Sequence, residues 1–334
     1  MSLQIKKINA ENEDQWQNFA RTHGTLYHDI NWAKIIAKTY NWRSAYYLVE
    51  RNAETVGLLP FMRQGDKVLS LPHLPFSGPI FKCGENQEEG MGLLLRQMEK
   101  EQCQFVESRS LGKTFEASSR YITMVVSIGN NQEAVWQGLR TKERNQVRHA
   151  QSSGLHVKIG LRYLNDFYNL YSRRMRDFGT PPHSLNWFAN ILTFLTGANI
   201  LAVMLNDAVI GAMFFIKYRD TIYISYAATN SKFNHLCPNV YMYWEIFKYA
   251  CSTDCSSVDL GRTTFTSSNF QFKKHWGGQP IELIYERIDI KTNSRLCLLP
   301  VQSDRGKKIM SKIWRNLPYA WHNRLGQIVR RYLP

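Results

Sequence analysis

The sequence has no long apolar run: it nowhere approaches the roughly 18 consecutive apolar residues that a membrane-spanning helix needs. Its opening residues, MSLQIKKINAENEDQW, lack the apolar core of a signal peptide. The six cysteines are scattered, and Cys251 and Cys255 have no second Cys or His pair placed to complete a tetrahedral metal site. We therefore expect a cytoplasmic protein with reduced thiols and no bound metal.

Acidic residues are nearly absent from the C-terminal end. Residues 291–334 contain ten Lys and Arg against one acid, Asp304, which gives +9 of the total +15 and leaves +6 for the first 290 residues. A basic balance implies an anionic partner such as RNA, a phosphorylated or nucleotide-linked substrate, or an acidic membrane surface. We expect no DNA partner.

Helical and strand-like patterns alternate along the chain, which indicates an α/β or α+β fold. The first half is expected to contain helices at 14–21 and 31–40, strands at 45–50, 55–62 and 67–71, a helix at 88–101 and a strand from 105. The second half is expected to contain helices at 166–178 and 184–195, strands at 200–205, 209–217 and 221–229, a helix from 238 and a strand before Asp259. With 44% hydrophobic residues the chain can bury one large core or two ordinary ones.

The two halves repeat one order of elements. Their middle strands share a core, VGLLPF at 56–61 and IGAMFF at 210–215, with Gly57 and Gly211 separated by 154 residues. The Pro- and Gly-rich segment 71–81 is too irregular for a helix or strand, and we expect it to be a binding loop or a domain wall.

The stretch 259–280, DLGRTTFTSSNFQFKKHWGGQP, carries the densest chemistry. Gly261 permits a sharp turn, and Lys273 and Lys274 follow inside a run of aromatic residues. A cation pair fixed by buried aromatics between two strands suits a phosphate, a carboxylate or a developing oxyanion. The alternative is a hairpin with two solvated lysines.

A basic helix is expected at 134–154. Arg140, Arg144 and Arg148 are each four residues apart and line one side of it. Arginines in a row can grip phosphate oxygens, although a solvated basic face has the same pattern.

The pattern of the 259–280 stretch, DLGR followed by FKK, WG and Pro, resembles the C-terminal signature of FemA/FemB-type acyltransferases. It is most similar to the FemAB-related proteins that accompany exopolysaccharide and PEP-CTERM systems. The segment RMRDFGTPPHS at 174–184 is similar to that family too. The family's K-x-R-x-x-x-R-x-A-x-x-x-G helix is matched by Lys142, Arg144, Arg148, Ala150 and Gly154.

The resemblance implies two tandem GNAT-like acyltransferase domains with mixed sheets flanked by helices. We expect the first domain at 1–130, the second, with the catalytic signature, at 131–290, and a basic amphipathic tail at 291–334. The implied reaction transfers an acyl or aminoacyl group to an amine on a cell-envelope or exopolysaccharide precursor. The sequence shows no Ser/His/Asp or Cys/His nucleophile constellation, which fits direct attack by the amine.

The resemblance also implies roles for individual residues. Lys273 would stabilise the oxyanion or the leaving group, and Asp259 would orient Arg262 or the incoming amine. Phosphate contacts are expected from Arg262, Arg144 and Arg148, and for the acceptor from Lys34. Further substrate-binding residues are expected to be Lys274, Trp276 and His183.

No tightly bound cofactor is expected, and the acyl donor is aminoacyl-tRNA or acyl-CoA. Gln151-Ser-Ser-Gly154 approaches the coenzyme A loop Q-x-x-G-x-G/A, but His156 replaces its last small residue. The implied acceptor is phosphorylated or is linked to a nucleotide or a lipid, and tRNA is a candidate partner. A different class of function is a non-catalytic RNA- or membrane-binding scaffold with a GNAT-like fold.

The tail is expected to form two short amphipathic helices, at 308–317 and 320–332. Rich in Lys and Arg and edged with Trp and Tyr, they could lie in an anionic headgroup layer, which would place the protein peripherally at the inner membrane. The alternative is that their apolar residues pack on the first domain and complete its core.

Overall fold

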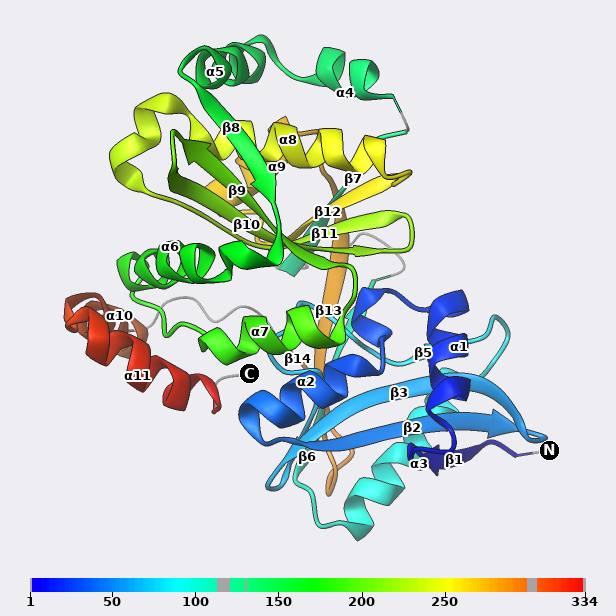
Figure 1. Ribbon diagram of the computed structural model, residues 1–334. Helices are drawn as coiled ribbons and strands as arrows, with labels where there is room; N and C mark the ends of the chain where they lie inside the picture. Colours follow the sequence, from blue (N-terminus) through cyan, green and yellow to red (C-terminus); the bar gives the residue numbers. More distant parts are fainter. Residues whose placement is uncertain (1, 113–120, 130, 299–304, 333–334) are drawn as a thin grey trace. The chain divides into compact units, whose positions relative to one another are not determined.

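The computed structural model describes residues 2–112, 121–129, 131–298 and 305–332, without the side chains of 305–308. Contacts divide the chain into two compact units, Met1–Tyr121 with Ile281–Pro300 and Ile122–Pro280 with Val301–Pro334. Both units are mixed sheets flanked by helices, so the expected fold class is confirmed (Figure 1). The boundaries at 130 and 290 stay a prediction, and the observed units instead group residues 281–290 with the first half.

The first unit is built on a six-stranded path with the order β1-β2-β3-β4-β6-β13. Its pairs are antiparallel except β4–β6, and β5 and β14 add to β3 and β13. Its elements are β1 (Gln4–Lys7), α1 (Glu13–His23), α2 (Asn31–Tyr40), β2 (Arg43–Arg51), β3 (Glu54–Gln64), β4 (Lys67–Ser70), β5 (Ile80–Phe81), α3 (Gln87–Lys100), β6 (Phe105–Leu111), β13 (Gln279–Asp289) and β14 (Arg295–Cys297).

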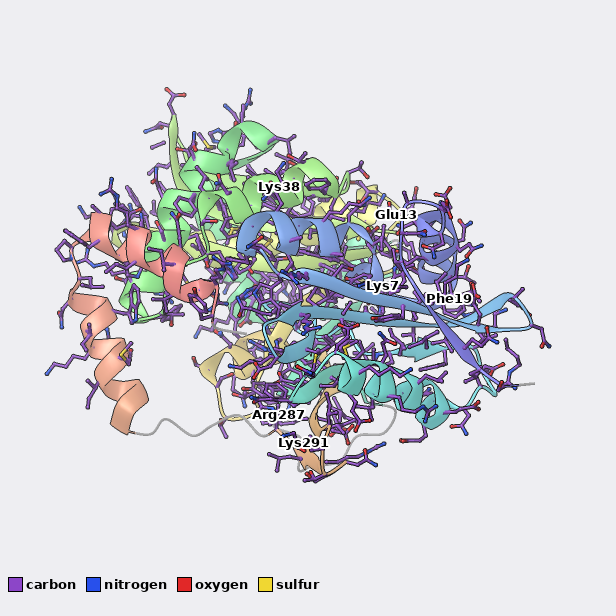
Figure 2. The ribbon with its side chains drawn as sticks, turned by 90° about the horizontal axis from the view of Figure 1, so that it is seen from below. Lys7, Glu13, Phe19, Lys38, Arg287 and Lys291 are labelled. Carbon is purple, nitrogen blue, oxygen red and sulfur yellow. The ribbon has the colours of Figure 1, made fainter. Side chains whose placement is uncertain are left out.

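The helices of this unit bury the faces that their apolar spacing predicts. α2 turns Trp32, Ile35 and Ile36 into the core, while Lys38 lies at its surface (Figure 2). α3 buries Leu94 and Met98 against the sheet.

The second unit repeats this plan. Its sheet has the order β7-β12-β11-β10-β9-β8, in which β11–β12 is the one parallel pair. Its elements are β7 (Tyr121–Ser127), α4 (Gln132–Gly138), α5 (Thr141–Ser152), β8 (Leu155–Ile159), α6 (Leu164–Asp177), α7 (Leu185–Phe194), β9 (Ala198–Leu205), β10 (Ala208–Tyr218), β11 (Thr221–Thr229), α8 (Pro238–Ser252), β12 (Ser257–Thr263), α9 (Ser268–His275), α10 (Arg305–Asn316) and α11 (Tyr319–Arg330). Two helices, a three-strand meander, a helix and a parallel strand thus recur, as the repeated sequence order predicts.

Two local predictions were wrong. The helix expected at 134–154 is broken into α4 and α5, because Leu139 and Arg140 are extended and the Leu139 side chain is buried in the core. The row of three arginines is therefore interrupted, and Arg140 instead pairs with Glu143 at 3.0 Å. The alternative of a hairpin with two solvated lysines was also wrong, since both lysines lie on α9, whose first turn is capped by Ser267.

The tail helices pack on the second unit, so the predicted packing on the first domain was wrong. α10 and α11 lie beside α6 (Figure 1). Ser311 donates a hydrogen bond to the Phe178 carbonyl at 3.2 Å, and a side chain on Gly179 would collide with the Ser311 backbone. Asp304 lies outside the described residues. Within the described ranges, no helix combines the length and the apolar character needed to cross a membrane.

Candidate active site

The strands β11 and β12 run side by side for only part of their length. They pair at residues 221–223 and 257–259. Beyond this point β11 stays with β10 as far as Thr229, whereas Arg262 and Thr263 of β12 pair with β7. We call the place where the two strands part the fork. A parted edge leaves backbone groups that need other partners, from the protein or from a ligand.

The backbone is irregular on both sides of the fork. β11 bulges at Ser225, and the register of β12 shifts between Asp259 and Arg262. Gly261 lies in this shift with φ +80°, and a Cβ there would be 3.1 Å from the Ile224 carbonyl oxygen. Because β12 continues to Thr263, the change of direction predicted at Gly261 takes the form of an irregularity inside the strand, and glycine suits this backbone for both reasons.

Lys273 reaches the fork from α9. Its Nζ donates hydrogen bonds to the carbonyl oxygens of Gly261, at 2.7 Å, and Arg262, at 3.1 Å. The side chain is only 7% exposed. Burial lowers the pKa of Lys273 to about 8, with Asp259 opposing the shift and Arg262 adding to it. The ammonium is therefore mostly charged at neutral pH and ready to give up its proton just above it.

Asp259 is a buried carboxylate that anchors the irregular turn. It accepts hydrogen bonds from the Thr123 hydroxyl at 2.6 Å and from the Gly261 N–H at 2.7 Å. Burial raises the pKa of Asp259 above its ordinary value, against the effect of these bonds and of Lys273. These hydrogen bonds hold Gly261, while the predicted action of Asp259 on Arg262 or an amine stays a prediction.

Lys274 and Trp276, the other two candidates from residues 259–280, do not lie at the fork in the way that Lys273 does. Lys274 is exposed. Trp276 is buried in the core of the second unit, stacked on Phe247 with ring centroids 5.3 Å apart and tilted toward Tyr243. Trp276 therefore packs the end of α9 against the core of the second unit. Its direct contact with a substrate stays a prediction.

Tyr226 follows the β11 bulge and lies near two residues that were predicted for the site, His183 and Arg262. His183 is buried with its ring 5.8 Å from the Tyr226 ring. Burial raises the pKa of the Tyr226 phenol, while the nearby charges of Arg330 and Arg262 and a bond from Trp187 act the other way. Tyr226 was not predicted from the sequence, because nothing in an alternating strand pattern distinguishes it from its neighbours.

Arg144 and Arg148 lie on α5, away from these contacts. Arg144 donates to the Gln137 carbonyl at 3.3 Å, and Arg148 lies over the Trp136 ring at 5.4 Å. Both guanidinium groups remain near the surface. Their described contacts are with α4 and with α5 itself, so their phosphate-binding role stays a prediction.

A cationic pocket of about 430 Å³ opens between the end of α6, the end of β11 and the start of α11. Four cations line it against one acid, Asp177, and they are Arg173, Arg174, Arg176 and Lys232. Asn230, Ser231 and Tyr319 add polar groups. Arg174 and Arg176 belong to the segment 174–184 singled out in the sequence, and Arg173 directly precedes it, but Lys232 was missed because it comes from the short 3-10 helix Ser231–Leu236, 56 residues after Arg176.

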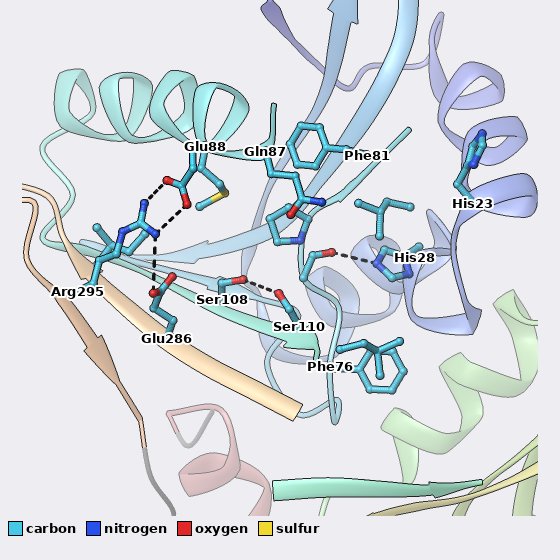
Figure 3. Close-up of a pocket in the computed structure, with 16 residues that line it drawn as sticks. His23, His28, Phe76, Phe81, Gln87, Glu88, Ser108, Ser110, Glu286 and Arg295 are labelled. Carbon is cyan, nitrogen blue, oxygen red and sulfur yellow. Dashed lines mark hydrogen bonds and ion pairs between the residues drawn. The ribbon is translucent and has the colours of Figure 1, made fainter. Parts of the chain in front are cut away.

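The first unit contains its own pocket, of about 320 Å³ (Figure 3). Phe76, Gly78 and Phe81 from the irregular segment 71–81 line it, so this segment does form a pocket wall. His28 points into it and bonds to the Gly78 carbonyl at 3.0 Å, and burial lowers the pKa of His28 to about 4. The opposite end is closed by Arg295 with Glu88.

Lys34 does not line this pocket. It lies on α2 and forms an ion pair with Glu13 at 2.6 Å. Its phosphate-binding role stays a prediction. Among the residues with described side chains, no group of three His, Cys, Asp or Glu is arranged to hold a metal ion.

Comparison with known proteins now adds to this geometry. Residues 137–274 match the family described as Acetyltransferase (GNAT) domain. A search of the curated proteins finds no match to this chain.

Three solved structures share the fold over nearly the whole chain. FemX is 16% identical, with 93% of this chain and 99% of that chain covered and a TM-score of 0.64. The tandem GNAT protein from the clavulanic acid biosynthesis pathway is 8% identical, with 91% and 100% covered and a TM-score of 0.55. L-PGS from Bacillus licheniformis is 10% identical, with 94% and 99% covered and a TM-score of 0.54.

The second unit therefore carries a GNAT acetyltransferase domain. The chain as a whole has the tandem GNAT-like fold and is structurally similar to FemX.

Proposed function

We propose that this protein is an acyltransferase that moves an activated acyl or aminoacyl group to an amine on a phosphorylated cell-envelope or exopolysaccharide precursor. The observation that carries this proposal is the Lys273 ammonium at the fork of β11 and β12. It lies inside the segment that matches the GNAT acetyltransferase domain. The sequence resemblance to FemAB-related proteins supports the choice of acceptor.

The reaction needs few groups from the protein. The amine nitrogen attacks the acyl carbonyl carbon, and the resulting tetrahedral intermediate carries a negative oxygen. Collapse of this intermediate breaks the bond from carbon to the donor oxygen or sulfur, the amine loses a proton and the leaving group gains one. The Lys273 ammonium would stabilise the negative oxygen or donate to the leaving group. A pKa of about 8 suits either role at neutral pH.

The cationic pocket supports an anionic acceptor. Three arginines and Lys232 converge on one hollow in the same unit as the fork. Guanidinium groups bind phosphate oxygens in a bidentate manner, so this pocket suits the phosphate or diphosphate that links a precursor to a nucleotide or a lipid. Arg262, beside Tyr226, would be a further phosphate contact.

Of the two donors, aminoacyl-tRNA is favoured by the loop that joins β11 to α8. Residues 230–237 contain no glycine and so lack the Q-x-x-G-x-G/A pattern that holds coenzyme A. Acyl-CoA remains the alternative, because the solved structure of N-myristoyltransferase from Saccharomyces cerevisiae, which shares this fold, contains bound myristoyl-CoA.

The test begins with the native protein. Small molecules that co-purify with it are identified by mass spectrometry, and each amine-bearing phosphorylated compound is incubated with charged tRNA or with acetyl-CoA. Formation of an amide product, dependent on the protein, is the expected result. Absence of any amide product with every retained compound and both donors would contradict the proposal.

A further inference from the structure

The tail helices present an apolar stripe to solvent. On α11 the exposed apolar residues are Trp321, Leu325 and Ile328, and Tyr332 is exposed just beyond the end of the helix at Arg330. The spacing of four and three residues places Trp321, Leu325 and Ile328 on one side of α11. Trp321 is 59% exposed and Ile328 is 61% exposed, which is unusual for residues of this size.

α10 extends the exposed apolar surface. Ile309, Met310 and Ile313 are each at least half exposed. Seven of the 13 large hydrophobic residues exposed in the described part of the chain therefore lie between positions 309 and 332. Such a concentration marks an interaction surface rather than scattered exposure.

The orientation of the stripe is fixed by the other side of the same helices. Trp314 on α10 and His322 on α11 are buried. A side chain on Gly326 would collide with Pro182, so α11 lies tightly on the second unit at this point. The Tyr319 hydroxyl is 2.5 Å from the Ser172 hydroxyl of α6. The stripe is thus the side of α11 that the protein's own core leaves uncovered.

The charges around the stripe have one sign. Residues 305–332 contain no Asp or Glu. Lys312, Arg315 and Arg324 are exposed, and Arg324 directly precedes Leu325 of the stripe. A surface that offers aliphatic and aromatic side chains with flanking cations matches the interface of an anionic bilayer, where apolar groups enter and cations meet phosphates.

We propose that α10 and α11 dock this protein on a bilayer that contains anionic phospholipids. The stripe lies between the headgroups, and Lys312, Arg315 and Arg324 contact lipid phosphates. RNA would use the cations but would leave the aliphatic stripe in water. A second copy would bring two helix pairs without acids together, which like-charge repulsion disfavours.

The experiment is co-sedimentation of the full-length chain with vesicles. One set contains phosphatidylglycerol and phosphatidylcholine, and the other contains phosphatidylcholine alone. We expect binding to the anionic vesicles, weakened by salt, and a loss of about ten-fold or more in the double variant Trp321→Ser/Ile328→Ser. The matched control Leu161→Ser/Leu296→Ser changes two leucines that are 54% and 60% exposed elsewhere, and it should bind like the unmodified chain.

Three outcomes would overturn the proposal. In the first, the intact protein binds neither anionic vesicles nor another partner. In the second, the double variant and its control lose binding to the vesicles equally. In the third, the protein self-associates or binds RNA but does not bind the vesicles. Thermal melting of each variant checks that it is folded, and little change is expected because all four positions are exposed. The proposal rests on the tail alone, so acyl transfer to a soluble acceptor would be unaffected by the double variant and its presence or absence is a separate result.

Discussion

The Lys273 ammonium nitrogen lies 2.7 Å from the carbonyl oxygen of Gly261. This bond ties α9 to β12 immediately beyond the fork, at the one residue whose positive φ lets the strand change direction. The same ammonium would be the charge nearest to an acyl group held in the fork. A single side chain thus donates hydrogen bonds to two backbone carbonyls of the parted strand and adds a positive charge beside it.

The rate of acyl transfer should fall as the pH rises through about 8. The pKa of Lys273 is lowered, so its ammonium is present below about pH 8 and is lost above it. A reaction that needs the charge loses it in the same range. The check is the pH profile of kcat/KM with an identified donor and acceptor. Lys273→Arg, where it retains activity, should remove this alkaline limb because arginine stays charged.

The same shift makes a prediction about stability. Between about pH 8 and the ordinary lysine pKa of 10.5, the unfolded chain binds more protons than the folded one. The free energy of unfolding should therefore rise with pH across this window, relative to Lys273→Met. Urea unfolding of the unmodified chain and of Lys273→Met at about pH 7.5, 9 and 10 measures this difference in the free energy of unfolding. Parallel pH dependence of the two chains would contradict a lowered pKa.

Truncation of two tryptophans of the tail should change the free energy of unfolding by very different amounts. Trp314→Ala should lower the free energy of unfolding by about 3 kcal/mol, since Trp314 is buried beside His322. Trp321→Ala, at an exposed position, should change it by less than about 0.5 kcal/mol. Chemical denaturation gives both values. Equal effects would mean that the tail does not pack on the second unit as described.

Use of aminoacyl-tRNA predicts a salt-dependent complex. Binding of charged tRNA should weaken steeply as salt rises, because phosphate contacts release counterions. Changing Arg144 and Arg148 together to Gln should flatten the slope of log K against log salt by about two units. The matched control changes Lys158 and Arg162, two exposed cations outside α5, to Gln. Saturable acetyl-CoA binding without tRNA affinity would support the other donor.

The sequence predicts the repeated element order well, because that order depends on apolar periodicity and turn residues. The middle strands with Gly57 and Gly211 are each followed by a strand that pairs in parallel with the strand after the next α-helix, β4 with β6 and β11 with β12, as the repeat requires. The turn at Gly261 was predictable for a related reason, since glycine marks backbone that other residues adopt with strain.

The rest depends on contacts that local patterns do not encode. The break at Leu139 arises because its side chain is needed in the core, which helix spacing alone did not reveal. Lys273 and Lys274 are neighbours with the same chemistry, and only the packing of α9 buries the first and exposes the second. Lys232 joins its pocket from a distant loop, so no window of sequence contains that site.

The most direct test of the account compares two adjacent lysines. Lys273→Met should lower kcat by roughly two to three orders of magnitude, because it removes the charge at the fork. Lys274→Met removes an exposed charge from the same helix and should have a far milder effect. Lys273→Met also leaves two carbonyls without their donor, so some loss of stability is expected and melting curves must show a folded enzyme at the assay temperature. With both variants folded, the account predicts that kcat collapses only in Lys273→Met, and an unchanged kcat in that variant would contradict it.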